Sequence, residues 1–389
     1  MRIAMFTDTY LPARDGVVTS ILIAREQLQA LGHEVFIFAP APKDDKDREP
    51  GVFYFRARTF KNYDTYGIPL YPTNKSDLLR QVKAEVIHSH GLTFQGLRSL
   101  MAGRNLGLPV VVTWHTMVTE AAQYYNFTKL PVWMVTLLMK RYLRSLLARA
   151  DAVVAPTQSI KEELLEMSPH IRHVEVIPTG VDSGRFSPHI DGLAMRESLG
   201  IGNDQMILSL GRIAWEKNLD LLLEGFKILL KDRGNVKLVI AGEGPARKHY
   251  IQKAGEMGLA DRVLFPGFVS DEDLPAYYAA CDAFTLASKF ETQGLVVLEA
   301  MASGKPVSAI NYRALKEIVS DGQNGYLFED GPESWAEATA KALDAPAGVR
   351  AAGRTKAEQY SIKIGVEQLV QLYDYAIRTK RERLNKHRR

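Results

Sequence analysis

The sequence is poor in cysteine: Cys281 is the only one among 389 residues. A single thiol cannot form an intrachain disulfide, so a small disulfide-stabilised secreted fold is excluded and a reducing compartment is expected. No apolar run is long enough to span a bilayer, which excludes a protein anchored by transmembrane helices. The residues after Met1 lead into a strand pattern rather than a secretory signal, so we expect a cytoplasmic location.

The chain also carries little net charge, +4 at pH 7, but the charge is unevenly placed. Residues 1–185 hold 22 Lys and Arg against 18 Asp and Glu, whereas residues 186–389 hold 27 of each. The final twelve residues hold seven cations and one glutamate. Such clusters favour an anionic surface, although a basic terminal tail is as often simply disordered. The sequence lacks the interleaved aromatic and basic residues of single-strand nucleic-acid sites, so we expect no nucleic-acid partner.

Apolar runs typical of buried strands alternate with helical patterns in two series. The first series is Arg2–Thr7, Glu34–Pro40, Val86–His90, Val110–His115, Ala152–Pro156 and Val174–Pro178; the second is Met206–Leu210, Val236–Ala241, Val263–Pro266, Ala283–Ala287, Pro306–Ile310 and Tyr326–Phe328. This alternation predicts an α/β protein with parallel sheets covered on both faces by helices.

Two series imply two Rossmann-like, doubly wound domains. We predict an N-terminal domain over 1–180, a linker over 181–203, and a second domain over 204–360. Residues 361–389 are predicted to form a helix that packs back on the first domain, followed by the basic tail.

The most specific pattern is the glutamate pair Glu291 and Glu299, joined by Thr-Gln-Gly-Leu-Val-Val-Leu. Glu291 follows the apolar run 283–287, and Gly294 opens an apolar helix that carries Glu299. The N–H groups at a helix start can hold phosphate, and carboxylates accept hydrogen bonds from hydroxyls. The stretch therefore suits an anionic, hydroxyl-rich ligand such as a nucleotide sugar. Taken alone, this spacing also occurs on solvated helix surfaces.

Two cations, Arg212 and Lys217, follow the apolar run 206–210, where a strand meets a helix. Open parallel sheets bind ligands at such positions. A guanidinium fork and an ammonium charge together suit a diphosphate. The alternative is a pair of surface cations, but cations near a helix start are unfavourable for the helix dipole, which favours an anionic partner.

The ordered set of motifs resembles family 4 of the retaining glycosyltransferases over nearly the whole chain. The motifs are Asp15-Gly16-Val17, Thr113-Trp-His115-Thr, Pro178-Thr-Gly-Val-Asp182, Gly211-Arg212 with Lys217, Gly242-Glu-Gly-Pro245, and the Glu291/Glu299 pair. The resemblance implies a GT-B fold, in which two Rossmann-like domains face a cleft. More narrowly, Thr7-Asp-Thr-Tyr-Leu-Pro, Gly16-Val-Val-Thr-Ser, Glu291-Thr-Gln-Gly-Leu and the stretch 114–156 resemble bacterial-type enzymes that glucosylate diacylglycerol.

This resemblance implies transfer of a hexose, first of all glucose from UDP-glucose, to a lipid acceptor such as diacylglycerol, with the anomeric configuration retained. The alternative is a mannosyl- or other glycosyltransferase that uses GDP-mannose or another donor with a soluble or different lipid acceptor. Front-face and covalent mechanisms both stay open.

The resemblance also implies which residues form the site. Catalytic roles fall on His115, Arg212, Lys217 and Glu291. The donor-binding residues are Gly16, Arg212, Lys217, Glu243, Val269, Glu291, Thr292, Gln293, Gly294, Leu295 and Glu299. Among them, Glu291 is expected to hold sugar hydroxyls and Glu299 ribose hydroxyls. No Asp-x-Asp motif lies near these elements, so we expect neither a metal nor another cofactor: the two cations would neutralise the leaving diphosphate.

Four further positions in the first half need comment. His115 ends a predicted strand, where a buried structural histidine is the alternative to a site residue. His88 and His90 have no evident third metal ligand, so we interpret them as loop structure. Gly16 would let backbone approach phosphate or sugar, although Asp15 stands where many relatives carry another glycine.

Residues 129–149 combine a strongly apolar composition with cations on one side. Trp133, Lys140, Arg141 and Arg144 predict a helix that lies in a membrane interface. The alternative is a core helix with a solvated basic face. On the first interpretation the protein associates peripherally with the anionic inner face of the cell membrane.

Overall fold

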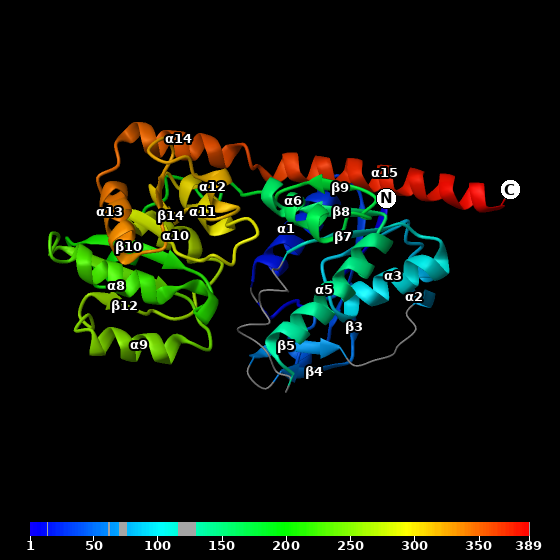
Figure 1. Ribbon diagram of the computed structural model, residues 1–389, viewed down its shortest axis with the longest axis horizontal. Helices are drawn as coiled ribbons and strands as arrows, with labels where there is room; N and C mark the ends of the chain where they lie inside the picture. Colours follow the sequence, from blue (N-terminus) through cyan, green and yellow to red (C-terminus); the bar gives the residue numbers. More distant parts are fainter. Residues whose placement is uncertain (14, 61–62, 70–75, 116–129, 389) are drawn as a thin grey trace. The chain divides into compact units, whose positions relative to one another are not determined.

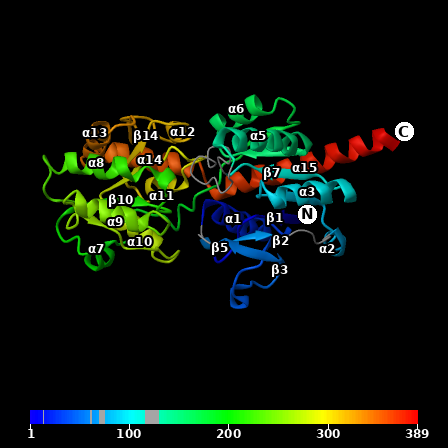
Figure 2. The same ribbon diagram turned by 60° about the horizontal axis from the view of Figure 1, so that its bottom comes forward.

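The computed structural model describes residues 1–13, 15–60, 63–69, 76–115 and 130–388 (Figure 1). The chain forms two compact units. Unit 1 comprises Met1–Gly180 and Ile362–Arg389, and unit 2 comprises Val181–Ser361. Each unit is a parallel sheet with helices above and below its strands (Figure 2).

Unit 1 contains a seven-stranded sheet in the order β3-β2-β1-β6-β7-β8-β9, with every neighbouring pair parallel. Its strands are β1 (Arg2–Phe6), β2 (Glu34–Pro40), β3 (Val52–Phe55), β6 (Val86–Ser89), β7 (Val110–Thr113), β8 (Ala152–Ala155) and β9 (Val174–Val176). Its helices are α1 (Gly16–Ala30), α2 (Ser76–Gln81), α3 (Phe94–Leu106), α5 (Val132–Arg149), α6 (Gln158–Met167) and α15 (Ile362–Arg388), with the short turn η1 (Asp45–Asp47). A separate antiparallel hairpin pairs β4 (Ala57–Phe60) with β5 (Tyr63–Pro69).

Unit 2 contains a six-stranded parallel sheet in the order β12-β11-β10-β13-β14-β15. Its strands are β10 (Gln205–Leu210), β11 (Val236–Ala241), β12 (Val263–Leu264), β13 (Ala283–Leu286), β14 (Val307–Ile310) and β15 (Tyr326–Phe328). Its helices are α7 (Leu193–Ser198), η2 (Trp215–Lys217), α8 (Leu219–Leu229), α9 (Arg247–Glu256), α10 (Leu274–Ala280), α11 (Leu295–Ala302), α12 (Leu315–Ile318), α13 (Pro332–Leu343) and α14 (Ala347–Glu358).

The strand composition explains both sheets. Every residue of β7 (VVVT) and of β13 (AFTL) is buried, as expected for parallel strands covered on both faces. In each sheet the strand order reverses once, between β1 and β6 in unit 1 and between β10 and β13 in unit 2. Doubly wound sheets bind ligands beyond the carboxyl ends of the strands at this reversal, which points to the loops after these four strands.

Residues 181–203, which we interpreted as a linker, are part of unit 2. Val181, Phe186 and Ile201 are buried in its hydrophobic core, and the N–H of Val181 donates to the carbonyl of Tyr360 at 2.8 Å. The sequence looked like a tether because its apolar residues are sparse and separated by Gly, Pro and Asp, yet these few side chains reach the core.

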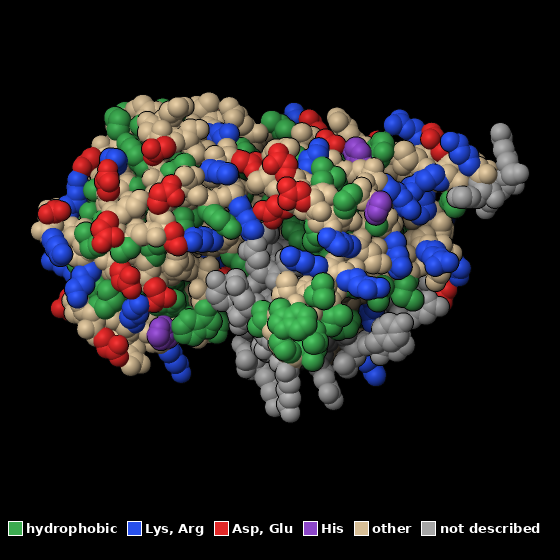
Figure 3. All heavy atoms as spheres, viewed as in Figure 1, with side chains coloured by type: hydrophobic (Ala, Val, Ile, Leu, Met, Phe, Trp, Pro, Cys, Tyr) green, Lys and Arg blue, Asp and Glu red, His purple; other side chains and the backbone are tan. Residues whose placement is uncertain are grey.

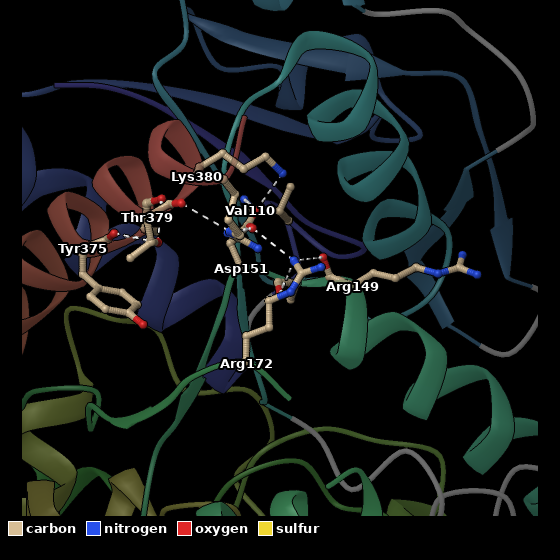
Figure 4. A network of polar contacts seen from close by, with 10 residues as sticks. Val110, Arg149, Asp151, Arg172, Tyr375, Thr379 and Lys380 are labelled. Carbon is tan, nitrogen blue, oxygen red and sulfur yellow. Dashed lines mark hydrogen bonds and ion pairs between the residues drawn. The ribbon is translucent and has the colours of Figure 1, made fainter. Parts of the chain in front are cut away.

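Helix α15 belongs to unit 1, where it packs against α1 and lies near β6 and β7. Near the C-terminal end of α15, the carboxylate of Asp151 binds cationic side chains from distant parts of the chain (Figure 4). The carboxylate, 1% exposed, accepts hydrogen bonds from Lys380 at 3.2 Å, Arg172 at 3.2 Å and Arg383. It also accepts from the N–H of Val110 at 2.9 Å. Cations of the predicted basic tail are therefore built into the fold of unit 1.

Candidate functional site

The loops after β10 and β13 meet at the strand reversal of unit 2. Lys217, at the end of η2, donates from Nζ to Oε1 of Glu291 at 2.5 Å. The two side chains are 23% and 17% exposed. Lys217 and Glu291 are 74 positions apart in the sequence, where both were assigned to the same site, and the structure brings them into contact.

Arg212 has a partner that the sequence interpretation missed. Its guanidinium donates to Glu216, whose side chain is 1% exposed. Arg212 itself stays 36% exposed, so part of its side chain remains accessible to solvent beside this ion pair. A buried carboxylate next to a predicted phosphate-binding arginine can orient it. The sequence did hold a sign of this pair: Arg212 and Glu216 are four residues apart, and a helical turn brings side chains at that spacing into contact.

Gly294 precedes α11 and adopts a left-handed conformation with φ of +87°. A Cβ built there would lie 2.5 Å from Cδ2 of Leu315, so glycine suits this close approach. Since glycine has no side chain, it cannot cap the first-turn amides as serine or aspartate would. Leu295 begins the helix, and Gln293, 5% exposed, and the half-buried Thr292 precede it. This helix start can offer N–H groups to an anion.

Glu299 lies on α11 and is 6% exposed. Its carboxylate accepts a hydrogen bond from the hydroxyl of Tyr278 at 2.7 Å. Burial raises the pKa of Glu299 to about 7, against the opposing effects of the Tyr278 hydroxyl and nearby Arg185. Tyr278 is a second residue that the sequence gave no signal for.

The loops after β11 and β12 continue this edge of the sheet. Gly242 has φ of +138°, and a Cβ on it would lie 1.9 Å from the carbonyl oxygen of Gly211. The N–H of Gly242 donates to the carbonyl of Gly267 at 2.8 Å, so a backbone hydrogen bond joins the loops after β11 and β12. Glu243 lies beside Gly267 and pairs with Arg247 at 3.5 Å. Val269, two residues beyond Gly267, packs against the core of unit 2.

In unit 1, His115 does not stand alone. Its Nε2 lies 2.8 Å from Nδ1 of His90. His88 bonds through Nδ1 to the Tyr373 hydroxyl at 2.7 Å and through Nε2 to Oγ1 of Thr113 at 2.6 Å. Our interpretation as loop structure is wrong for His88, which lies within β6, whereas His90 follows the end of that strand; both rings are buried. The missed signal was the two-residue spacing, which puts both rings on one face of a strand.

The start of α1 differs from the expected phosphate-approach loop. Asp15 caps the helix, its Oδ1 accepting from the N–H groups of Val17 and Val18, each at 2.9 Å. First-turn amides that a phosphate would use are therefore already bonded within unit 1. A Cβ on Gly16 would meet nothing within 4 Å, so the fold of unit 1 does not itself require glycine there.

The first half of α5 exposes apolar side chains. Trp133 is 66% exposed and Leu137 59% exposed, and Lys140 and Arg141 follow at helical spacing on that side. We call these four residues the α5 face. Figure 3 shows hydrophobic side chains gathered where Figure 1 draws the start of α5, with Lys and Arg side chains beyond them. Arg144 is exposed as well, but its Nε donates to the carbonyl of Met167 at 2.5 Å, so it also supports the end of α6.

Helix α3, which contacts α5, adds an exposed face that we did not predict. Phe94, Leu97 and Met101 are 48%, 38% and 46% exposed, and Arg104 follows them. The Tyr142 hydroxyl on α5 donates to the carbonyl of Thr93 at 2.8 Å and ties the two helices. Within the described residues, no helix is long and apolar enough to cross a bilayer.

Comparison with known families accounts for both units. The model "Glycosyltransferase Family 4" matches residues 14–185, and the model "Glycosyl transferases group 1" matches residues 193–361. A relative from Streptococcus pneumoniae, alpha-monoglucosyldiacylglycerol synthase, is 33% identical over 84% of this chain and 75% of its own length. The chain belongs to glycosyltransferase family 4.

Other relatives of this glycosyltransferase have more than one specificity in their names. An alpha-monoglucosyldiacylglycerol synthase from Acholeplasma laidlawii is 29% identical over 86% of each chain. A GDP-mannose-dependent alpha-mannosyltransferase from Mycobacterium tuberculosis is also 29% identical, over 85% of this chain and 84% of its own. Sequence identity therefore establishes that the chain is a glycosyltransferase, but it does not establish which sugar is transferred.

Solved structures agree with the two-unit GT-B fold. Anabaena HepE in complex with UDP-glucose matches with a TM-score of 0.79 at 19% identity, over 96% of this glycosyltransferase and 99% of that chain. WaaG, a glycosyltransferase of lipopolysaccharide biosynthesis, matches with a TM-score of 0.71 at 17% identity, over 95% of this chain and 99% of its own.

Proposed function

We propose that this glycosyltransferase moves glucose from UDP-glucose to the hydroxyl of diacylglycerol at a membrane surface, forming an α-linkage with retention. The observation that carries the lipid acceptor is the exposed α5 face, where apolar and basic side chains adjoin. Helices of this type lie in the interface of anionic membranes. The relatives named alpha-monoglucosyldiacylglycerol synthase, 33% and 29% identical, support the same acceptor and sugar.

The unit 2 edge supports a donor with a diphosphate. Arg212 and Lys217 supply positive charge, and the start of α11 supplies N–H groups. Both act on the charge that grows on the leaving diphosphate. Oε1 of Glu291 bonds to Lys217, and its other oxygen can accept a sugar hydroxyl.

We further propose that these side chains, without a divalent metal, neutralise the diphosphate. Activity measured after exhaustive chelation with EDTA should equal that of the untreated enzyme. Activity that is lost on chelation and restored by Mg²⁺ would contradict this part of the proposal.

The decisive experiment offers labelled UDP-glucose and GDP-mannose separately to the purified protein with vesicles containing diacylglycerol and anionic lipid. We expect an organic-extractable glucolipid, with an α-anomeric coupling in its proton NMR spectrum, from UDP-glucose. Transfer from GDP-mannose alone would favour the mannosyltransferase alternative, which the relatives of that name support. A water-soluble product would contradict the lipid acceptor, and Lys217→Ala serves as the impaired control.

A further inference from the structure

Three histidine rings form a cluster at the carboxyl edge of the unit 1 sheet. The ring centroids of His88 and His90 are 4.0 Å apart, and those of His90 and His115 are 5.1 Å apart. All three rings line a small cavity in unit 1, together with Ser20 and Thr179. The cluster therefore links strand β6 to the second residue after β7.

One hydrogen bond connects His90 to His115. The atoms are Nδ1 of His90 and Nε2 of His115, so one ring donates a proton and the other accepts it. His90 is 5% exposed, and among the residues that the structure describes its other nitrogen, Nε2, has no hydrogen-bond partner. The direction of this hydrogen bond therefore decides whether the buried Nε2 of His90 carries a proton or a lone pair.

If His115 donated, His90 would carry its own proton on Nε2, as a buried N–H group without a partner. If His90 donates from Nδ1, only a ring lone pair remains at Nε2. Buried N–H groups without partners are the rarer and more costly case, so the second direction is favoured.

Both rings are neutral at neutral pH. Burial lowers the pKa of His115 to about 4. Burial also lowers the pKa of His90 well below its usual range, as do the neighbouring rings of His88 and His115. A neutral imidazole holds one proton. If Nε2 of His115 accepts, that proton is on Nδ1.

We propose that His90 is a positioning residue that holds His115 in the tautomer protonated on Nδ1. Its catalytic meaning rests on the proposed function, with His115 in the catalytic role that the family resemblance implies. In this tautomer His115 gives a hydrogen bond from Nδ1 to an oxygen, while its Nε2 lone pair is occupied by His90. His115 then stabilises substrate and is not the general base that removes the acceptor proton.

His88 supplies an internal control. Both of its nitrogens are engaged, by the Tyr373 hydroxyl and by Thr113. It therefore contacts the His90 ring without a hydrogen bond to His115. Tyr373→Phe removes a buried hydroxyl from the same cluster but leaves the bond between His90 and His115 untouched.

The test is NMR of the full chain with ¹⁵N-labelled histidine, because ring ¹⁵N shifts distinguish protonated from bare nitrogens. The His115 signals are assigned by their loss in His115→Gln. We expect a protonated Nδ1 and a bare Nε2 in the wild type and in Tyr373→Phe. His90→Asn, whose amide can donate from the same place, should retain this tautomer.

His90→Leu removes the donor, so His115 should populate the other tautomer. In the transfer assay we expect kcat to fall by about tenfold or more, since a misplaced proton on a site histidine is costly, while Asn at position 90 restores most of it. An Nε2-protonated His115 in the wild type, or unchanged shifts and kcat in His90→Leu, would overturn the proposal. The NMR result stands even if no nucleotide sugar is a substrate, so the two proposals fail separately.

Discussion

At the scale of single residues, the ion pair between Lys217 and Glu291 is the contact with the clearest consequence. Lys217→Ala removes a cation from the expected diphosphate site and leaves Glu291 without its partner. We expect kcat/KM to fall by about 10²–10³, as for the loss of one donor that stabilises a developing anion. Initial rates with the nucleotide sugar measure this.

Lys289→Ala is the matched control for that variant. Lys289 lies two residues before Glu291, is 42% exposed, and pairs with Asp330 at 2.5 Å. Its loss should change kcat/KM less than threefold, as a rough bound for an exposed pair. Equal losses in the two variants would mean that net charge, and not the pair with Glu291, sets the rate.

Glu299 predicts a pH dependence of nucleotide binding. Its pKa of about 7 means that the carboxyl is largely protonated at pH 6 and largely ionised at pH 8. Ribose hydroxyls donate best to the ionised form, so the Kd for UDP should fall by roughly tenfold over this range. Calorimetric titrations at several pH values measure it.

Glu299→Gln is the control, because UDP phosphate itself titrates near pH 6. The variant should keep only the phosphate's dependence, and an unchanged profile would refute the role of Glu299. Rising pH, which should strengthen nucleotide binding through Glu299, should weaken the stability that this same group contributes to the fold. The folded chain keeps a proton that the unfolded chain releases above its usual pKa of 4.5, so this group lowers the free energy of unfolding as pH rises toward about 7.

At the scale of elements, the buried carboxylate of Asp151 ties the last turns of α15 to unit 1. In Asp151→Asn, Arg172, Lys380 and Arg383 would remain close together without their anion. We expect the free energy of unfolding to fall by about 3 kcal/mol, as for breaking a buried pair. Urea unfolding measures the loss.

The comparison for Asp151 is Asp77→Asn on α2. Asp77 also pairs with an arginine, Arg80, but its side chain is 80% exposed. This variant should cost less than about 1 kcal/mol. If the two variants were equally stable, the buried network would contribute no more than a surface pair.

The strands were predictable where burial leaves an uninterrupted apolar run. This holds for β2 and β11, whose bounds agree with the prediction. The sequence did not reveal β3, a short strand with three of four residues only partly buried, nor the hairpin of β4 and β5. Edge strands and hairpins owe their form to neighbours and turns, which composition alone does not report.

The site was predictable where a motif fixes a residue at the end of a strand. Lys217 and Glu291 were assigned in this way, since parallel strands bring their carboxyl ends to one edge. Tyr278 and His90 were not, because their roles come from contacts with Glu299 and His115, which only the packed fold creates. The capping of α1 by Asp15 likewise needed the backbone geometry.

At the scale of the whole molecule, the structure narrows where an anionic surface could be bound. The basic tail is an obvious candidate in the sequence, but two of its cations, Lys380 and Arg383, form ion pairs with Asp151. Arg144 is committed to the carbonyl of Met167. Lys140 and Arg141 are exposed and adjoin the apolar side chains of the α5 face, so they combine positive charge with an apolar surface, as an interfacial helix requires.

Membrane association therefore predicts that Lys140→Glu combined with Arg141→Glu weakens binding to anionic vesicles. Each cation near such a surface contributes about 1 kcal/mol, so loss of both should lower the partition coefficient by roughly 30-fold or more. Lys231→Glu with Lys248→Glu makes the same change in net charge on exposed residues of unit 2 and should have little effect. Vesicle sedimentation compares the pairs. Equal losses would assign the attraction to net charge, and no loss in either would remove the α5 face as the membrane contact.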